Sequence, residues 1–187
     1  MGDAEQIYPL AARIIHAGMA LLGVVAYVTG EFLIDGPESL GFLLHTYFGL
    51  SLMAALLVRI WYGFGGPDNL RFSTWPLFSR THRQLVWAAI RGLFRFRIQT
   101  HDAHRGLAGL TQAFGLALFF WMAATGTAIH FVVDVPKHPL FRPLVKLHAL
   151  GELLIVLYLL LHVGSVVVHS LHGSPIWQRM WKFGGDA

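Results

Sequence analysis

Four histidines stand inside long apolar stretches of the sequence, where an ionisable side chain is costly if the stretch lies in a membrane. They are His16, His45, His148 and His162. An imidazole in such a place either binds a metal or hydrogen-bonds a backbone carbonyl and holds helices together. For one histidine alone the second use is the more common, so the spacing of the four has to decide.

The spacing places the four histidines at two depths. His148 and His162 are 14 residues apart, which in an α-helix is about 21 Å of rise and nearly the same face. His16 comes early in the first apolar stretch and His45 early in the second, so in antiparallel helices they lie toward opposite sides of the membrane. We therefore expect His45 to meet His148 and His16 to meet His162, a pattern that favours metal binding.

The composition restricts the metal. The chain has 11 histidines, 10 acids and no cysteine, which excludes disulfides, thiolate ligands and thiol nucleophiles. Two imidazoles at each depth are too few for a closed zinc site, which takes four ligands, and the sequence places no carboxylate beside either pair. A porphyrin supplies the other four ligands, and two trans imidazoles leave no position for dioxygen. The sequence predicts two haems b that transfer electrons.

Four apolar spans must position these histidines. The spans cover about residues 9–30, 40–62, 107–132 and 144–172, each long enough to cross about 30 Å of hydrocarbon at ~20 residues. Of the 187 residues, 55% are hydrophobic and 13% are charged, with a mean hydropathy of +0.56, which excludes an ordinary soluble domain. We expect an all-α membrane protein, a four-transmembrane-helix bundle forming one domain over residues 1–187, with no cleaved signal peptide.

Positive charge predicts the orientation, because Lys and Arg near span ends stay on the cytoplasmic side. The loop of residues 63–106 contains many arginines, whereas the connection between spans one and two contains only the acids Glu31, Asp35 and Glu38. We expect both termini to be cytoplasmic and the His45 and His148 pair to lie toward the periplasm. The sequence pI of about 9.8 then reflects topology and does not indicate nucleic-acid binding.

An amphipathic stretch lies within the loop of residues 63–106. Residues 81–97 place Leu85, Ala89, Leu93 and Phe96 on one arc, with arginines around the remainder. This pattern predicts an interfacial helix resting on anionic headgroups. The alternative is a docking face for a partner protein.

Several residues are candidates for contact with the haems. Gly49 follows His45 by one turn, and a small residue lets a flat macrocycle approach the backbone; ordinary close helix packing is the alternative. Arg13 and Arg59 are candidate partners of the propionates of the cytoplasmic haem, and Lys146 or His138 of the periplasmic haem. For each of these cations the simpler explanation is a snorkelling or topology-setting residue.

The remaining histidines have weaker indications. His169 follows His162 by seven residues, so it is a candidate for a quinone carbonyl, a propionate or the headgroups, and His130 is a candidate to flank a haem or a quinone. The cluster of His101, Asp102 and His104 is either a proton-uptake site or a capped helix start with solvated histidines. His82 and His172 are expected at the surface.

The motifs together resemble a known family. They are RIIHAG in span one, HTYFG and VRIWYGFGG in span two, LHALGELL and LLLHVGSVVVH in span four, PIWQRMWKFGG after it and, as a weaker echo, Thr125-Gly126 in span three. This pattern is similar to bacterial cytochrome b561 and to the b-type cytochrome subunits of nickel-iron hydrogenases. The resemblance implies that the four histidines ligate two haems b, and that the protein exchanges electrons with ubiquinone or menaquinone in the bacterial inner membrane.

The loop of residues 63–106 bears on the subgroup. With YGFGG followed by Arg71 and Phe72, it resembles members that anchor periplasmic redox subunits such as hydrogenases or multihaem c-type cytochromes. An electron-transfer subunit between a quinone and a periplasmic partner is therefore the first hypothesis. The second is a free-standing superoxide:quinone oxidoreductase, with superoxide attracted by Lys137, His138 and Lys146. The third is a small transporter or a haem-free structural membrane protein.

Overall fold

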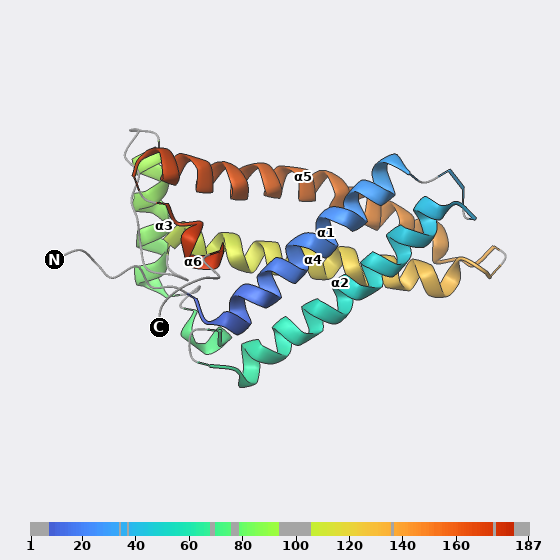
Figure 1. The fold of residues 1–187 in the computed structure, drawn as a ribbon, viewed down its shortest axis with the longest axis horizontal. Coiled ribbons are helices and arrows are strands. Elements are labelled where there is room, and N and C mark those ends of the chain that lie inside the picture. The colour runs from blue at the N-terminus through green and yellow to red at the C-terminus, as the bar shows by residue number, and fades with distance from the viewer. Residues whose placement is uncertain are drawn as a thin grey trace. The chain divides into compact units, whose positions relative to one another are not determined.

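The computed structural model describes residues 8–33, 35–36, 38–67, 70–75, 79–93, 106–135, 137–173 and 175–181, and these contain helices but no strands. The elements, shown in Figure 1, are α1 (Leu10–Phe32), α2 (Leu40–Gly65), the short 3-10 helix η1 (Phe72–Thr74), α3 (Arg80–Leu93), α4 (Gly106–Val132), α5 (Phe141–Leu171) and α6 (Gln178–Trp181). Four of them, α1, α2, α4 and α5, are long and apolar enough to cross a membrane. The predicted all-α architecture with four membrane helices is confirmed.

The helix ends differ from the predicted ends by a few residues. The helix α5 begins at Phe141 and not at Leu144, because Pro143 falls in the first helical turn, where a missing N–H breaks no helical hydrogen bond. The helix α2 continues to Gly65, three residues beyond the predicted end. The predicted amphipathic helix is α3, which ends at Leu93; Phe96 lies outside the described residues.

Ser39 caps the start of α2. The Ser39 hydroxyl accepts a hydrogen bond from the backbone N–H of Phe42 at 3.1 Å and from that of Asp35 at 3.2 Å, and it donates to the carbonyl of Gly36 at 2.8 Å. Gly36 has a φ of 93°, a conformation that glycine adopts without strain. The hydroxyl thus joins the turn to the first turn of the helix.

We expect Ser39→Ala to lower the free energy of unfolding by about 1 kcal/mol, because the N–H of Phe42 loses its cap. Ser51→Ala is a matched control, since Ser51 is exposed on the same helix and its replacement should change stability by less than about 0.5 kcal/mol. Denaturant titration in detergent measures both. Equal effects of the two substitutions would contradict the capping role.

The chain divides into two compact units. The first contains Met1–Arg13, Trp61–Leu116 and Tyr158–Ala187, and the second contains Ile14–Ile60 and Ala117–Leu157. Each long helix contributes a segment to both units. The prediction of one domain over residues 1–187 stays a prediction.

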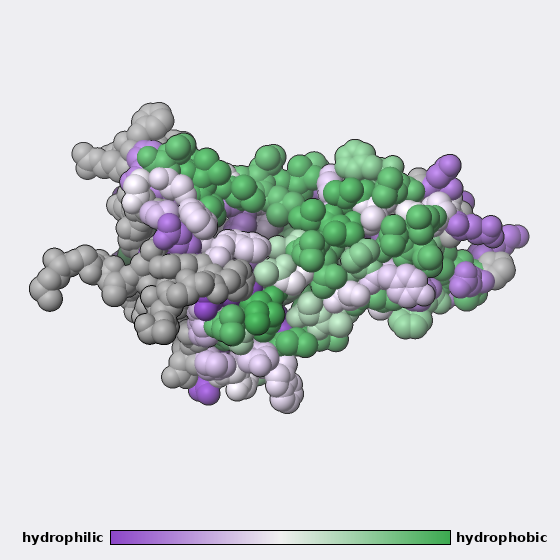
Figure 2. All heavy atoms as spheres, in the orientation of Figure 1, coloured by the Kyte–Doolittle hydropathy of each residue, from purple (hydrophilic) through white to green (hydrophobic). Residues whose placement is uncertain are grey.

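The second unit has a thin core and an apolar exterior. Leu52, Leu56, Leu118 and Ile155 are buried between its helices, while apolar side chains such as Leu153 remain 69% exposed. Figure 2 shows hydrophobic side chains over the helices and hydrophilic ones at the α1–α2 and α4–α5 loops. Such an apolar exterior on long apolar helices is the surface that lipid covers. The protein is a multi-pass membrane protein in contact with lipid.

The first unit joins the remaining helix segments to the loop of residues 63–106. The backbone N–H of Tyr8 donates to the carbonyl of Arg179 at 3.1 Å, and the Gln112 amide donates to the Tyr8 hydroxyl at 3.4 Å. In Figure 1 α3 runs across the direction of the neighbouring segments of α4 and α5. That direction suits a helix lying along a membrane surface.

Candidate functional site

A cavity of about 340 Å³ lies in the second unit, and all four of the unit's helix segments line it. Its size is in the range of small-molecule and cofactor sites. Most of the lining is apolar, and the polar groups include His45 of α2 and His148 of α5. The structure therefore brings one of the two predicted histidine pairs together in one cavity.

The two imidazoles in the cavity are close and mutually perpendicular. Their ring centroids are 6.0 Å apart and their planes make an angle of 90°. A metal–imidazole bond is about 2 Å, so two trans imidazoles on one metal have bonding nitrogens about 4 Å apart and ring centroids about 6 Å apart. Each imidazole can rotate about its bond to the metal, so a 90° angle between the two ring planes is compatible with binding to one metal. The observed separation fits one metal between the two rings.

The proton on each ring follows from its hydrogen bond. The Nδ1 of His45 lies 2.8 Å from the carbonyl oxygen of Ala26. A carbonyl only accepts, so Nδ1 carries the proton and donates it. The lone pair is then on Nε2, and no described residue hydrogen-bonds to that nitrogen. A metal-binding histidine is usually held in this way by a backbone carbonyl.

The Nδ1 of His148 has a side-chain hydroxyl as its hydrogen-bond partner. Its Nδ1 lies 2.9 Å from the hydroxyl oxygen of Thr125. That hydroxyl has one proton, which it donates within α4 to the carbonyls of Trp121 at 2.9 Å and Met122 at 3.1 Å. When the proton is donated to one of these carbonyls, the oxygen accepts from the Nδ1 of His148, and Nε2 is left as the available ligand.

The chemistry of the donor set suits a haem better than a bare ion. Among the described residues, no group of three or more His, Cys, Asp or Glu side chains is placed to hold a metal ion. Two neutral imidazoles need further ligands, which a porphyrin provides. The residues in the cavity thus fit the group that the sequence predicts.

Glycines give the two rings their space. A Cβ atom on Gly30 would lie 2.6 Å from the Nδ1 of His45, and one on Gly126 would lie 3.2 Å from the Cε1 of His148. Gly49 also lines the cavity, but a Cβ there would meet nothing within 4 Å. The approach of a haem to Gly49 stays a prediction.

The second predicted pair is divided between the units. His16 is half-buried on α1 in the second unit, and His162 is half-buried on α5 in the first. The pairing of His16 with His162 therefore stays a prediction. The helix α5 is unbroken from His148 to His162, as the 14-residue spacing requires.

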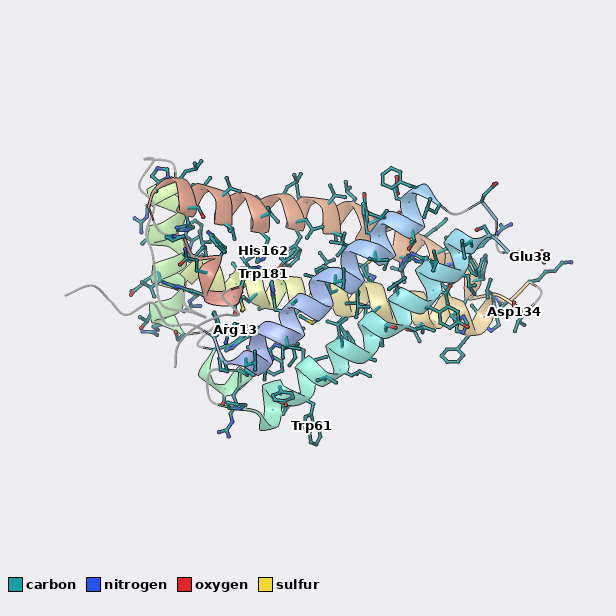
Figure 3. All side chains as sticks on the ribbon, viewed as in Figure 1. Arg13, Glu38, Trp61, Asp134, His162 and Trp181 are labelled. Carbon is teal, nitrogen blue, oxygen red and sulfur yellow. The ribbon has the colours of Figure 1, made fainter. Side chains whose placement is uncertain are left out.

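His162 lies against an aromatic neighbour in the first unit. Its ring is stacked on that of Tyr158, one turn earlier, with centroids 5.4 Å apart and an angle of 12°. Tyr158 in turn contacts Gly115 and the ring of Phe114 on α4. Figure 3 shows the His162 side chain directed from α5 toward α4. The stack holds the plane of the His162 ring.

The predicted cations have varied positions. Arg13 is half-buried in the first unit, and Arg59 is half-buried in the second. Lys146 is exposed and lies two residues before His148, which places it on a different face of α5. His138 accepts a hydrogen bond at Nδ1 from the N–H of Leu140 at 3.2 Å.

The structure describes some of the other candidate histidines. His130 lines the cavity, although its ring is largely exposed. His169 is half-buried, and its Nδ1 is buried without a hydrogen-bond partner among the described residues. His172 is exposed, as predicted. The remaining predictions, on His101, Asp102, His104 and the side chain of His82, lie outside the described residues.

Sequence reasoning missed two carboxylates. Glu31 and Glu152 line the same cavity as His45 and His148, although among the described residues they complete no group of three or more side chains that could hold a metal ion. Glu152 is the only acid in α5. An isolated acid inside an apolar span is itself a signal of function, and it lies one turn after His148.

Comparison with known proteins gave one match. The family described as prokaryotic cytochrome b561 matches residues 7–183. No curated protein matches the chain, and no solved structure matches it.

Proposed function

Since the chain belongs to the prokaryotic cytochrome b561 family, we propose that it carries electrons between a quinone and a periplasmic redox partner through two haems b. As a member of this family, the protein is a membrane b-type cytochrome that binds haem b and takes part in electron transfer. A haem-free transporter is thereby set aside.

The contact between His45 and His148 carries the proposal. The 6.0 Å centroid separation and the two outward-directed Nδ1–H bonds support axial ligation of one haem by this pair. A haem held by His45 and His148 would supply one-electron transfer. The apolar lining excludes water, and the two hydrogen bonds keep the rings oriented.

His16 and His162 are the proposed ligands of the second haem. The unbroken α5 places His162 14 residues after His148, and stacking on Tyr158 holds its ring. Arg13 and Arg59 are proposed to neutralise propionates on this side, and Lys146 on the other side. Gly49 is proposed to border the haem of the first pair.

We propose that electrons enter on the side of His45 and His148 and leave on the side of His16 and His162, where the quinone is reduced. This direction assumes cytoplasmic termini in a bacterial inner membrane, which the positive-inside pattern supports. His169 is the proposed contact of the quinone, because its buried Nδ1 has no hydrogen-bond partner among the described residues. The alternative quinone site is the cavity beside His130.

His169→Gln tests the quinone site. We expect quinone reduction by the purified protein to slow by at least about tenfold while haem content is unchanged, since the glutamine amide donates hydrogen bonds but cannot transfer a proton to the quinone. Stopped-flow reoxidation of the dithionite-reduced protein by a soluble quinone measures the rate. His172→Gln, three residues away and exposed, is the control. If His130→Gln slows the reaction and His169→Gln does not, the quinone lies at the cavity.

A superoxide:quinone oxidoreductase is the second candidate function. Exposed Lys137 and Lys146 favour it by attracting an anion. The same end of the second unit also exposes acids, including Glu38 and Asp134, labelled in Figure 3, which oppose that attraction. We therefore place the partner-linked function first. Fast haem reduction by superoxide, with no other protein present, would reverse this order.

A further inference from the structure

The hydrogen bonds that hold His45 and His148 differ in one respect. The acceptor for His45 is a main-chain carbonyl, that of Ala26, which no substitution removes. The acceptor for His148 is the hydroxyl of Thr125. The ring of His45 is therefore held by a backbone group, whereas the ring of His148 is held by the Thr125 hydroxyl together with a backbone contact to Met122.

The Thr125 hydroxyl is also well placed to accept. Its proton is donated to helix carbonyls at 2.9 and 3.1 Å, and a hydroxyl that donates is polarised into a better acceptor. An imidazole that donates its Nδ1–H to a good acceptor becomes more basic at Nε2. A more basic ligand stabilises the oxidised, more positive metal over the reduced one.

We propose that Thr125 positions the His148 ring and lowers the midpoint potential of the haem held by His45 and His148. This inference rests on the proposed axial role of His148. Thr125 acts through His148 and needs no contact with the haem. Through this hydroxyl, the side chain at position 125 adjusts the midpoint potential of the haem held by His45 and His148.

The helix offers a matched control. Thr127 lies two residues later, lines the same cavity, and donates to the carbonyl of Ala123 at 2.7 Å. It therefore has the same kind of intrahelical bond as Thr125, but no described bond to a histidine. Thr127→Val removes a threonine hydroxyl from the same stretch of α4 without touching His148.

The experiment is a spectroelectrochemical titration of the purified holoprotein and of Thr125→Val, Thr125→Ser and Thr127→Val. We expect Thr125→Val to raise one midpoint potential and leave the other unchanged. A change of about fivefold in the reduction equilibrium, the size of one ordinary hydrogen bond, is about 40 mV for one electron. Thr125→Ser, which keeps the hydroxyl, should titrate like the wild type. Thr127→Val, which removes a hydroxyl that lines the cavity without a described bond to a histidine, should shift the potential by less than Thr125→Val.

Each other outcome has a defined meaning. The inference is wrong if Thr125→Val leaves the midpoint potential unchanged, or if Thr127→Val shifts it by the same amount. The proposed function still holds in both cases if the protein contains two haems per chain. If Thr125→Val loses one haem, Thr125→Ala removes the hydroxyl without added bulk and is titrated instead. If Thr125→Val and Thr125→Ala both lose that haem and Thr125→Ser keeps it, the result supports the role of Thr125 in positioning the His148 ring. If the purified wild-type protein contains no haem, the proposed function itself is wrong.

Discussion

Replacing His148 by alanine is expected to lower the haem content from two per chain to one. His45→Ala should remove the same haem, because in the proposed site the two rings, whose centroids are only 6.0 Å apart, would both hold one metal. His162→Ala should remove the other haem. The pyridine haemochrome of each purified variant gives the count, and the redox titration shows which potential is lost.

The double variant sharpens this result. His45→Ala with His148→Ala should lose no more haem than either single variant, since both residues serve one site. His172→Ala is the control, because His172 is exposed and its Nδ1 bonds to the carbonyl of Val168 within α5. A double variant with no haem would show that the two histidines serve different haems.

The second large effect is expected from Gly30→Ala. The added Cβ would lie 2.6 Å from the Nδ1 of His45, closer than carbon and nitrogen can pack. The ring or α1 must shift, and the bond to Ala26 that orients the imidazole is strained or lost. Loss of such an orienting bond costs about tenfold or more in metal affinity. We therefore expect weak haem binding at this pair.

Gly18→Ala is the matched control for Gly30→Ala, because it lies on the same helix and its Cβ would meet nothing within 4 Å. Alanine favours a helix over glycine by up to about 1 kcal/mol, so neither change should weaken α1 itself. Transfer of haem to an excess of a haem-scavenging protein measures the affinity. Haem retention by Gly30→Ala equal to that of the wild type would contradict the close approach.

Helix rise and hydropathy explain what could be predicted from the sequence. Spans of apolar residues had to be helices because lipid leaves no other partner for their backbone groups. The depth of a residue follows from its position along such a helix, so His45 could be paired with His148 from the sequence alone. The cap at Ser39 was readable because it depends on local contacts only.

Helix rotation explains most of what could not be predicted. Whether Thr125 or Thr127 faces His148 depends on a rotation of α4 that an almost uniformly apolar sequence does not encode. The approach of Gly30 to His45 likewise depends on the distance between α1 and α2. Glu152 was readable in principle as an isolated acid in an apolar span.

The most direct test of the central claim is a haem count of the purified wild-type protein combined with its low-temperature electron paramagnetic resonance spectrum. Two haems b per chain, both low-spin with two imidazole ligands, are the result we predict from the four histidines. A chain with one haem, or with a high-spin haem that has an open axial position, would contradict the ligation by two histidine pairs.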